Sequence, residues 1–555
     1  MHKNFDPEQY KDQLSKILEF IDSKDDSSYE QVRKILSKHR KDDGNFFSKD
    51  ELVAGYHHLI EQGVFDDNSE LLEKIRMKPT RTMSGVTTVT VLTKPYPCPG
   101  NCIFCPDDVR MPKSYLSDEP GAQRAEKNLF DPYLQTYNRL VAIRNIGHNT
   151  DKIELIILGG TWSYYPEEYQ IWFIKECFRA LNDFGSNAKI KEITPEGYAT
   201  NRSESATWEE LFEQHRTNET ADSRCIGLVV ETRPDHVTEE EVIRIRKLGA
   251  TKVQIGIQSL DDEILAMNGR GHTVSQTIHA IKLLRMAGFK IHAHWMANLY
   301  GSTVEKDIAD YKKLWEEDIQ PDELKLYPTS IIEGTILNKL YQHGKYKPYT
   351  HEELLQVITE AMKATPRYCR ITRVIRDIPS DDIVYGNKYT NFRQMAEQDL
   401  IEKGQRCQCI RCREIRGSKV EKDDLAIEII EYKTVLGREL FISYKTISDD
   451  KIVGFLRLSL PKRDPTNRQF IDELIDNALI REVHVYGVVV GIGEKEKGRS
   501  QHLGLGKKLI QKAEEIAQKE KFSGISVISA IGTREYYKKL GYGKGSLYLT
   551  KTFDR

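Results

Sequence analysis

The chain has 555 residues, of which 39% are hydrophobic and 30% charged, and its formal net charge is −2 at pH 7. This length exceeds what one ordinary hydrophobic core supports, so we expect several structural units in a globular protein. No apolar run approaches the roughly 20 residues that a membrane span needs, and the N-terminus lacks the apolar core of a signal peptide. We therefore expect a cytoplasmic protein without membrane attachment, whose nine cysteines are metal ligands or free thiols rather than disulfides.

The periodicity of apolar residues predicts a helical N-terminal region and a barrel-like middle. Residues 1–77 carry apolar side chains at helical spacing between Leu14 and Ile21 but hold no chemical motif. A β-rich stretch at 86–91 follows, and short apolar strands then alternate with amphipathic helices as far as residue 335. This alternation predicts an α/β fold with a parallel sheet, closed into a partial or full (β/α) barrel. The expected strands are 153–160, 227–235, 252–260, 290–299 and 323–330.

The C-terminal third reads differently from this barrel region, which we assign to residues 78–335. Residues 336–420 are mixed and basic and end in a cysteine cluster, so we expect a linker there. Residues 421–555 predict a second α/β unit, with several strands, a helix from about 502 to 520, another strand and a final helix.

The first cysteine cluster is Cys98, Cys102 and Cys105, with the spacing C-x3-C-x2-C. Three closely spaced thiolates can hold three irons of a 4Fe–4S cluster and leave the fourth iron open. S-adenosylmethionine (SAM) would chelate that iron, and an electron from the cluster would cleave its sulfonium to a radical. A structural zinc loop with a distant fourth ligand is the alternative.

Short motifs at the expected strand ends accompany this cluster. The spacing is similar to the radical SAM superfamily signature, and the resemblance assigns roles to the residues that follow the strands. Gly159 and Gly160 would receive the SAM amino group, because glycine lets backbone approach a ligand closely. Glu231 and Arg233 would meet its ribose and methionine, and Gln258 would face the same mouth.

The second cysteine cluster is Cys407, Cys409 and Cys412. Thiolates this close together favour zinc, which in a structural site takes four ligands. Cys369 is our candidate for the fourth. A second iron–sulfur cluster and free thiols in a basic loop remain the alternatives. A zinc ion would fold a linker that lacks a core of its own.

A glycine-rich segment opens the helix expected near residue 502. Gln501, Gly504 and Gly506 form Q-x-x-G-x-G there, and free N–H groups at a helix N-terminus bind phosphate, here the pyrophosphate of coenzyme A. The preceding strand would pair with the pantetheine amides. Downstream, Tyr537, or secondarily Tyr536, could act as general acid beside the departing thiolate; ordinary helix packing is the alternative. The strand residues are Glu482, Val483, His484 and Val485.

Together these parts resemble the catalytic subunit of Elongator, the tRNA carboxymethyluridine synthase family, from about residue 78 to the end. The blocks KPTRTMSGV, NGRGHT, RVIRDIP and GTREYYKKLGY carry the resemblance. It implies a radical-SAM barrel joined to a GNAT acetyltransferase fold. It also implies that Lys152 reaches acetyl-CoA from the barrel side, that Leu505, Gly506 and Lys507 form the pyrophosphate loop, and that the N-terminal region binds tRNA. Two departures are Pro106–Asp107–Asp108, where glycines are expected, and Tyr389, where a histidine is expected.

The function that the resemblance implies is a tRNA-modifying acyltransferase. It would use acetyl-CoA and SAM radical chemistry to build a carboxymethyl group on C5 of the wobble uridine, with the anticodon stem–loop as partner and Elongator-type subunits or a second copy as possible assembly partners. A protein lysine acetyltransferase with a structural iron–sulfur domain is the alternative, and a tRNA-binding scaffold without catalysis is a third hypothesis.

Three basic runs lie beside these motifs. The ordinary interpretation of a charge run is a solvated face. Because nucleic-acid phosphates attract clustered Arg and Lys, we interpret the runs as phosphate contacts. They are Lys74, Arg76, Lys78 and Arg81; Arg367, Arg370, Arg373 and Arg376; and Arg406, Arg411, Arg413 and Arg416.

Overall fold

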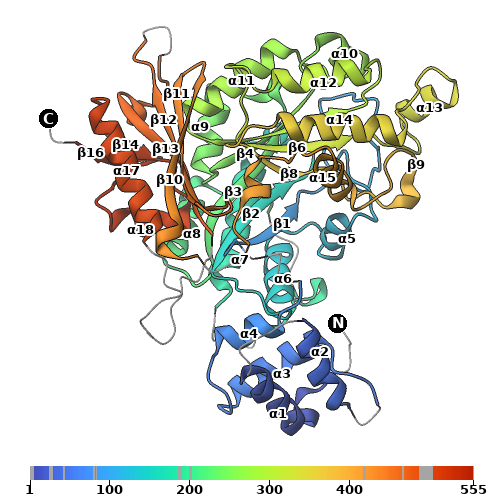
Figure 1. Cartoon of the computed structure of the whole chain (residues 1–555), viewed down its shortest axis with the longest axis vertical. Coiled ribbons are helices and arrows are strands. Elements are labelled where there is room, and N and C mark those ends of the chain that lie inside the picture. Colours follow the sequence, from blue (N-terminus) through green and yellow to red (C-terminus); the bar gives the residue numbers. More distant parts are fainter. Residues whose placement is uncertain are drawn as a thin grey trace.

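The N-terminal region folds into four helices around its own apolar core. In this computed structural model the described residues are 5–23, 29–41, 44–78, 82, 84–185, 191–198, 203–416, 420–464, 468–486 and 504–553. Leu14, Leu18 and Tyr56 are fully buried between the helices, as their helical spacing predicts. The bundle lies at one end of the molecule, below the barrel in Figure 1. Its helices are α1 (Lys11–Asp22), α2 (Tyr29–Lys38), α3 (Lys49–Glu61) and α4 (Ser69–Ile75).

The central unit is an open sheet of seven strands in the order β1-β2-β3-β4-β5-β6-β8. Every adjacent pair is parallel, so the predicted partial barrel is confirmed. β8 is the strand that the sequence analysis missed; it lies inside the expected linker and pairs with β6. The strands are β1 (Thr87–Leu92), β2 (Lys152–Leu158), β3 (Arg224–Thr232), β4 (Lys252–Gln258), β5 (Lys290–Ala297), β6 (Glu323–Pro328) and β8 (Arg370–Arg373).

Helices between the strands cover the outer face of this sheet, as right-handed strand–helix–strand connections require. Thr207, Thr273 and Thr350 each begin a helix with a capping box, which satisfies backbone N–H groups at the helix start. The helices are α5 (Pro120–Lys127), α6 (Pro132–Arg144), α7 (Glu167–Asp183), α8 (Trp208–Asn218), α9 (Glu239–Lys247), α10 (Asp262–Met267), α11 (Val274–Met286), α12 (Val304–Lys313), α13 (Ile336–Gln342) and α14 (His351–Ala364).

The segment after α14 links the two large units. Besides β8 it holds β9, which pairs with β7 from the chain before α13, and two helices near the second cysteine cluster. Because β8 completes the barrel sheet, this segment is part of the central unit as well as a connection. The elements are β7 (Ile331–Ile332), β9 (Ile383–Tyr385), α15 (Phe392–Glu402) and α16 (Ile410–Arg413).

The C-terminal unit is a second seven-stranded sheet, in the order β10-β11-β12-β13-β14-β16-β15. All its pairs are antiparallel except β13 with β14, and α17 covers one face. The predicted strands and both helices are confirmed. The elements are β10 (Leu425–Thr434), β11 (Gly437–Thr446), β12 (Ile452–Pro461), β13 (Asn477–Val485), α17 (Leu505–Lys519), β14 (Gly524–Val527), α18 (Arg534–Lys538), β15 (Gly543–Lys544) and β16 (Leu549–Thr552).

The other face of this second sheet packs against the amino ends of the barrel strands (Figure 1). Apolar side chains of both units belong to one buried cluster, and buried ion pairs cross the seam. Asp322, at the start of β6, accepts hydrogen bonds from Arg481 and lies 3.4 Å from Arg457. A buried charge is tolerated when it is paired in this way. Among the described helices, none combines the length and the apolar character that crossing a bilayer requires.

Candidate active site

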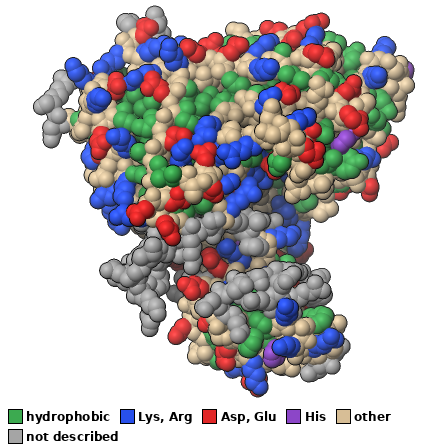
Figure 2. All heavy atoms as spheres, in the orientation of Figure 1, with side chains coloured by type: hydrophobic (Ala, Val, Ile, Leu, Met, Phe, Trp, Pro, Cys, Tyr) green, Lys and Arg blue, Asp and Glu red, His purple; other side chains and the backbone are tan. Residues whose placement is uncertain are grey.

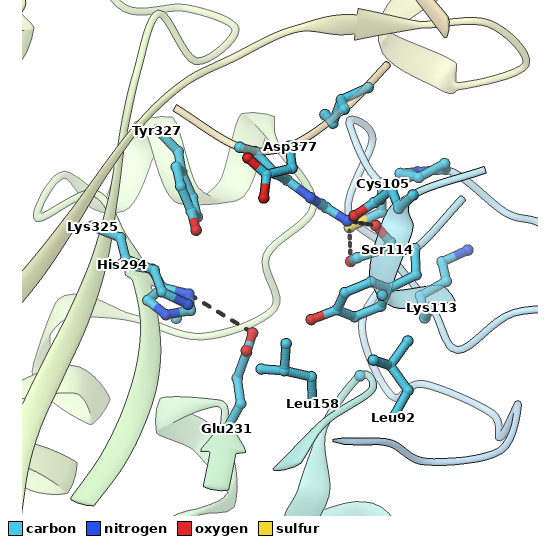
Figure 3. Close-up of a pocket in the computed structure, with 18 of the residues that line it drawn as sticks. Leu92, Cys105, Lys113, Ser114, Leu158, Glu231, His294, Lys325, Tyr327 and Asp377 are labelled. Atoms are coloured by element: carbon cyan, nitrogen blue, oxygen red, sulfur yellow. Dashed lines mark hydrogen bonds and ion pairs between the residues drawn. The ribbon is translucent and has the colours of Figure 1, made fainter. Parts of the chain in front are cut away.

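A cavity of about 610 Å³ lies at the carboxyl ends of the barrel strands, where barrel folds build their active sites. Cys98, Cys102 and Cys105 all line it. In Figure 3, Glu231 and His294 point toward one another on one side, while Cys105 and Ser114 lie on the other. The structure therefore brings the first cysteine cluster and the predicted strand-end residues to one site.

The three thiols stand in different environments. A hydrogen bond from Cys105 and then the charge of Arg270, whose Nη1 lies 3.1 Å from the sulfur, lower the pKa of the Cys102 thiol to about 5. The same contact raises the pKa of Cys105, whose Sγ is 3.0 Å from the hydroxyl of Ser114. Cys98 Sγ lies 3.8 Å from the Thr161 hydroxyl. Iron–sulfur clusters are bound by thiolates, and a neighbouring guanidinium favours the thiolate form.

Buried polar atoms without partners support the fit of a charged ligand in this cavity. Arg233 Nη1, Arg270 Nε and Gln258 Oε1 are buried and have no hydrogen-bond partner among the described residues. Such atoms are costly unless something satisfies them. The acidic residues that follow the third cysteine are neutralised locally: Asp107 lies 2.8 Å from Lys113, and Asp108 lies 2.8 Å from Arg110.

The strand-end residues lie where the sequence predicted them. Gly159 has φ +128°, and a methyl group there would lie 1.9 Å from the Thr93 hydroxyl, so glycine is required. Gly160 has φ +75°, lines the cavity and faces open space. Gln258 ends β4 with φ +65°. Arg233 is held by Asp235 at 2.9 Å.

Four further residues of this cavity escaped the sequence analysis as site residues: Arg270, Lys325, Tyr327 and Arg376. Arg270 lies in the block NGRGHT and Arg376 in the block RVIRDIP, so those motifs held the signal. Nothing in the sequence separates Lys325 and Tyr327 from other strand residues.

The expected acyl-donor site lies where β13 and β14 part. Their ladder ends at Ile480, while β12 continues to pair with β13 as far as Val485. From Glu482 to Val485 no described strand lies on the β14 side, so backbone groups face an open edge there. This splay suits pairing with the amides of a pantetheine chain.

The N-terminus of α17 lies beside the end of this open edge, because a methyl group on Gly506 would lie 3.8 Å from the Val485 side chain. Gly504 adopts φ +63° and caps the N-terminus of α17, followed by Leu505, Gly506 and Lys507. A turn of this shape leaves N–H groups free for phosphate. Gln501 lies outside the described residues.

The two candidate tyrosines on α18 differ sharply in position. Tyr537 is 7% exposed and packs in the apolar core of the C-terminal unit. Tyr536 is 43% exposed, and a methyl group on Gly506 would lie 3.1 Å from its hydroxyl. The geometry therefore favours Tyr536 at the acyl-donor site over Tyr537, which the sequence analysis preferred.

Lys152 begins β2 at the amino end of the barrel. Its side chain is 45% exposed and lies 3.9 Å from Asp151. Its neighbour across the ladder is Arg224, whose side chain touches the position of Gly532. Lys152 thus lies one strand away from the seam between the units, and its reach to acetyl-CoA stays a prediction.

The second cysteine cluster is compact. The sulfur atoms of Cys407, Cys409 and Cys412 all lie within 4.8 Å of one another. Arg393 Nη2 is 3.2 Å from the Cys412 sulfur. Cys369 is not part of this group; its carbonyl instead accepts a hydrogen bond from the Ile410 N–H at 2.9 Å. Three thiols this close could hold a zinc ion, and Cys369 as a fourth ligand stays a prediction.

Several arginines of the basic runs are already paired inside the protein. For these arginines the observed contact is an internal ion pair, and phosphate contact by the rest of the runs stays a prediction. Over the face in Figure 2, cationic and anionic side chains are interspersed. Arg81 lies outside the described residues. The paired arginines are Arg367 (Asp450, 2.9 Å), Arg370 (Glu414, 2.7 Å), Arg376 (Glu119, 2.8 Å) and Arg413 (Asp450, 3.2 Å).

Comparison with known proteins agrees with this geometry. The family model for the Radical SAM superfamily matches residues 96–311, and the model for the Radical_SAM C-terminal domain matches residues 321–402. The chain is 39% identical to a tRNA uridine(34) acetyltransferase of Methanocaldococcus infernus, over 89% of this chain and 90% of that protein. It is 34% identical to human Elongator complex protein 3, over 87% and 86%.

A solved structure gives the same answer for the fold. The archaeal Methanocaldococcus infernus Elp3 with an N-terminal deletion superposes with a TM-score of 0.69 at 36% identity, covering 84% of this chain and 99% of that one. The chain therefore belongs to the radical SAM superfamily and, within it, to the family of tRNA uridine(34) acetyltransferase and Elongator complex protein 3.

Proposed function

We propose that this protein modifies the wobble uridine of tRNA, using acetyl-CoA and SAM to form a carboxymethyl group at C5. In this reaction one hydrogen atom of the acetyl methyl group would pass to the radical derived from SAM, and the methyl carbon would bond to C5. C5 would then release its hydrogen as a proton together with one electron, which balances the electron that cleaved SAM, and hydrolysis of the thioester would release coenzyme A. The observation that carries the proposal is that a thiol-lined cavity and an open acyl-donor edge occur in one packed body. The names of the relatives, tRNA uridine(34) acetyltransferase among them, supply the substrate.

In the cavity, Cys98, Cys102 and Cys105 would hold a 4Fe–4S cluster, and Arg270 would keep Cys102 in its thiolate form. A bound cluster with SAM supplies a radical that abstracts hydrogen. Gly160 leaves room for the amino group of SAM, and the Glu231 carboxylate would accept hydrogen bonds from SAM. The enclosed walls would keep water from the reacting carbon.

At the C-terminal unit, which we propose to be a GNAT-type acetyltransferase domain, the β13 edge would bind pantetheine. Its strand residues are Glu482, Val483, His484 and Val485. The turn at Gly504 would bind the pyrophosphate, with Gln501 beside it. The Tyr536 hydroxyl would protonate the departing thiolate.

We further propose a zinc ion on Cys407, Cys409 and Cys412, and RNA contacts by the N-terminal helices of residues 1–77. The wobble base would leave its stack to enter the cavity, as base-modifying enzymes require. Nine free cysteines support a reducing compartment, the cytoplasm. Elongator-type subunits or a second copy of this chain are candidate partners.

The proposal is tested by mass spectrometry of nucleosides from tRNA incubated anaerobically with reconstituted protein, SAM, acetyl-CoA and a reductant. We expect a carboxymethyl mass increase on the wobble uridine that requires every component. In parallel, acetyl-CoA turnover should rise with tRNA and not with a lysine-rich peptide. Peptide acetylation with unmodified tRNA would overturn the proposal in favour of protein acetylation.

A further inference from the structure

Two short elements of the C-terminal unit flank the place where the acetyl thioester would sit. One is α18, which carries Tyr536. The other is the end of β13, which carries Glu482. Both elements lie at the seam between the two units, and each forms ion pairs with a charged side chain of the barrel unit.

On α18 the ion pairs are formed with Glu219, which directly follows α8. Its carboxylate lies 3.0 Å from Arg534, 2.8 Å from Lys538 and 2.9 Å from Lys544. Arg534 and Lys538 stand on either side of Tyr536 in the sequence. The Glu219 side chain is 8% exposed and Arg534 is 13% exposed, so solvent screens this pair little. Lys538 and Lys544 are 34% and 40% exposed, so their pairs with Glu219 are screened more.

The turn before α18 is fixed against the same unit. A methyl group on Gly532 would lie 2.6 Å from the Arg224 side chain and 2.9 Å from the Cys225 carbonyl of β3. This contact leaves no room for a side chain, so the start of the helix is set by β3. Glu219 then sets its rotation through the two cations that bracket Tyr536.

On β13 the ion pair is formed with Lys290, the first residue of β5. Its ammonium lies 2.6 Å from the Glu482 carboxylate and 3.3 Å from Glu323 of β6. Glu482 also accepts from Arg457 Nε at 2.9 Å. Charges of Lys290 and Arg457 lower the pKa of Glu482 against the opposing effect of burial. Lys290 is therefore the one barrel residue among the described partners of Glu482.

We propose that Glu219 and Lys290 are positioning residues for acyl transfer: from the barrel unit they hold the two elements between which acetyl-CoA reacts. The inference rests on the proposed function and extends it, because it makes the acyl-donor site a composite of both units. Neither residue touches the thioester; Glu219 acts through Tyr536, and Lys290 acts through Glu482.

The physical reason is the sensitivity of a proton transfer to geometry. A donor must lie within about 3 Å of the atom that it protonates, and a misplacement of 1 Å can cost on the order of 100-fold in rate. Coenzyme A would be bound mainly through the turn at Gly504 and the β13 backbone. Loosening α18 should therefore slow turnover without weakening binding.

The test measures kcat and KM for tRNA-dependent acetyl-CoA hydrolysis, together with the Kd of a non-hydrolysable acetyl-CoA analogue, on the full-length reconstituted protein. The variants are Glu219→Gln and Lys290→Met, with Glu219→Asp and Lys290→Arg as conservative rescues. Glu176→Gln is the matched control for Glu219, since it is a buried carboxylate paired with Arg179 within the barrel unit. Lys175→Met is the control for Lys290, since Lys175 is about as exposed as Lys290 and its ion pair with Glu176 lies within the barrel unit.

We expect Glu219→Gln to lower kcat about 30-fold and to leave the Kd of the analogue within about twofold. Lys290→Met should lower kcat and also raise the Kd of the analogue, because Glu482 lies on the β13 segment that would bind pantetheine. The double variant should lose less kcat than the product of the two single losses, because both act on one geometry. The rescues should recover most of the activity, and the two controls should stay within about threefold of wild type. Thermal melting of each variant separates misfolding from mispositioning.

The outcomes separate this inference from the function beneath it. Variants with wild-type kcat overturn the inference alone. A wild-type protein that hydrolyses acetyl-CoA but leaves the wobble uridine unmodified overturns the proposed function, while the kcat comparison still decides the inference. A wild-type protein that does not bind the analogue overturns both.

Discussion

His294 Nδ1 lies 3.7 Å from the Glu231 carboxylate, across the mouth of the barrel (Figure 3). Burial raises the pKa of Glu231 and holds the pKa of His294 well below its usual range. Both shifts disfavour the charged forms of the two side chains, so binding of a charged ligand should change their protonation. SAM carries a sulfonium cation, which would favour the ionised carboxylate.

This relationship predicts that SAM binding tightens as the pH rises. Burial raises the pKa of Glu231, and SAM would be bound by the ionised carboxylate, so protonation of Glu231 at low pH should weaken SAM binding. Affinity should therefore rise with pH through that pKa and then level off. Equilibrium dialysis of labelled SAM with reconstituted protein between pH 5 and 8 measures it.

In Glu231→Gln the affinity should be lower and its pH dependence flatter. Glu241→Gln changes a buried carboxylate on α9 that pairs with Arg244 and serves as the control. A Glu231→Gln protein with the wild-type pH profile would assign the titration to another group.

The second prediction separates the two tyrosines of α18. Tyr536→Phe should lower kcat for acetyl-CoA hydrolysis by about 100-fold, at the lower end of what a general acid contributes. Tyr537→Phe keeps the buried ring that packs against Tyr542 and should stay within about threefold of wild type. Steady-state kinetics with saturating tRNA provide the measurement. Equal losses of kcat in both variants would show that the difference in burial between the two tyrosines does not identify the general acid.

Much of this architecture follows from the sequence because its signals are local. The strands from β2 to β6 are short apolar runs. Because they are parallel in one sheet, their carboxyl ends lie together at one end of the barrel. β8 escaped because R-I-T-R buries only Ile371 and reads as a basic loop; its place depends on pairing with β6. The choice between Tyr536 and Tyr537 also needed the fold, since adjacent helix residues differ only in which face is buried.

The same limit, that the sequence does not show which distant residues are in contact, applies to the arginines of the basic runs. Spacing in the sequence cannot reveal that Asp450, from the hairpin of β11 and β12, pairs with both Arg367 and Arg413. Long-range ion pairs turn these two arginines of apparent phosphate-binding runs into internal cross-links. The cysteine motifs, by contrast, were informative because closely spaced ligands need no distant partner.

The third prediction concerns the second cysteine cluster. Cys412→Ser should remove about one zinc per chain and lower the melting temperature, since a structural zinc contributes folding energy directly. Iron reconstituted at Cys98, Cys102 and Cys105 should be unchanged. Elemental analysis by mass spectrometry measures both metals. The control is Cys177→Ala, which alters a buried thiol on α7 remote from both clusters. Iron in place of zinc at this position would favour a second iron–sulfur cluster.

The last prediction concerns Asp322, the fully buried carboxylate at the seam. Charges of Arg481 and Arg457 outweigh burial and lower its pKa to about 2. A carboxylate with a depressed folded-state pKa stabilises the protein above its unfolded pKa of about 4, and this contribution is lost as the pH falls from about 4 toward 2. Asp322→Asn leaves two buried arginines short of a counter-charge and should cost about 3–5 kcal/mol at pH 7.

Urea denaturation at pH 7, 4.5 and 3 measures this cost. The difference between wild type and variant should be constant from pH 7 to about 4.5 and should shrink at pH 3, where Asp322 is largely protonated in the unfolded chain but still ionised in the folded protein. Asp399→Asn changes a partly exposed carboxylate on α15, which pairs with the exposed Lys403 at 2.7 Å, and should cost less than about 1 kcal/mol, as surface pairs do. A cost that stays unchanged down to pH 3 would mean that lost packing, rather than lost charge, sets the stability of this seam.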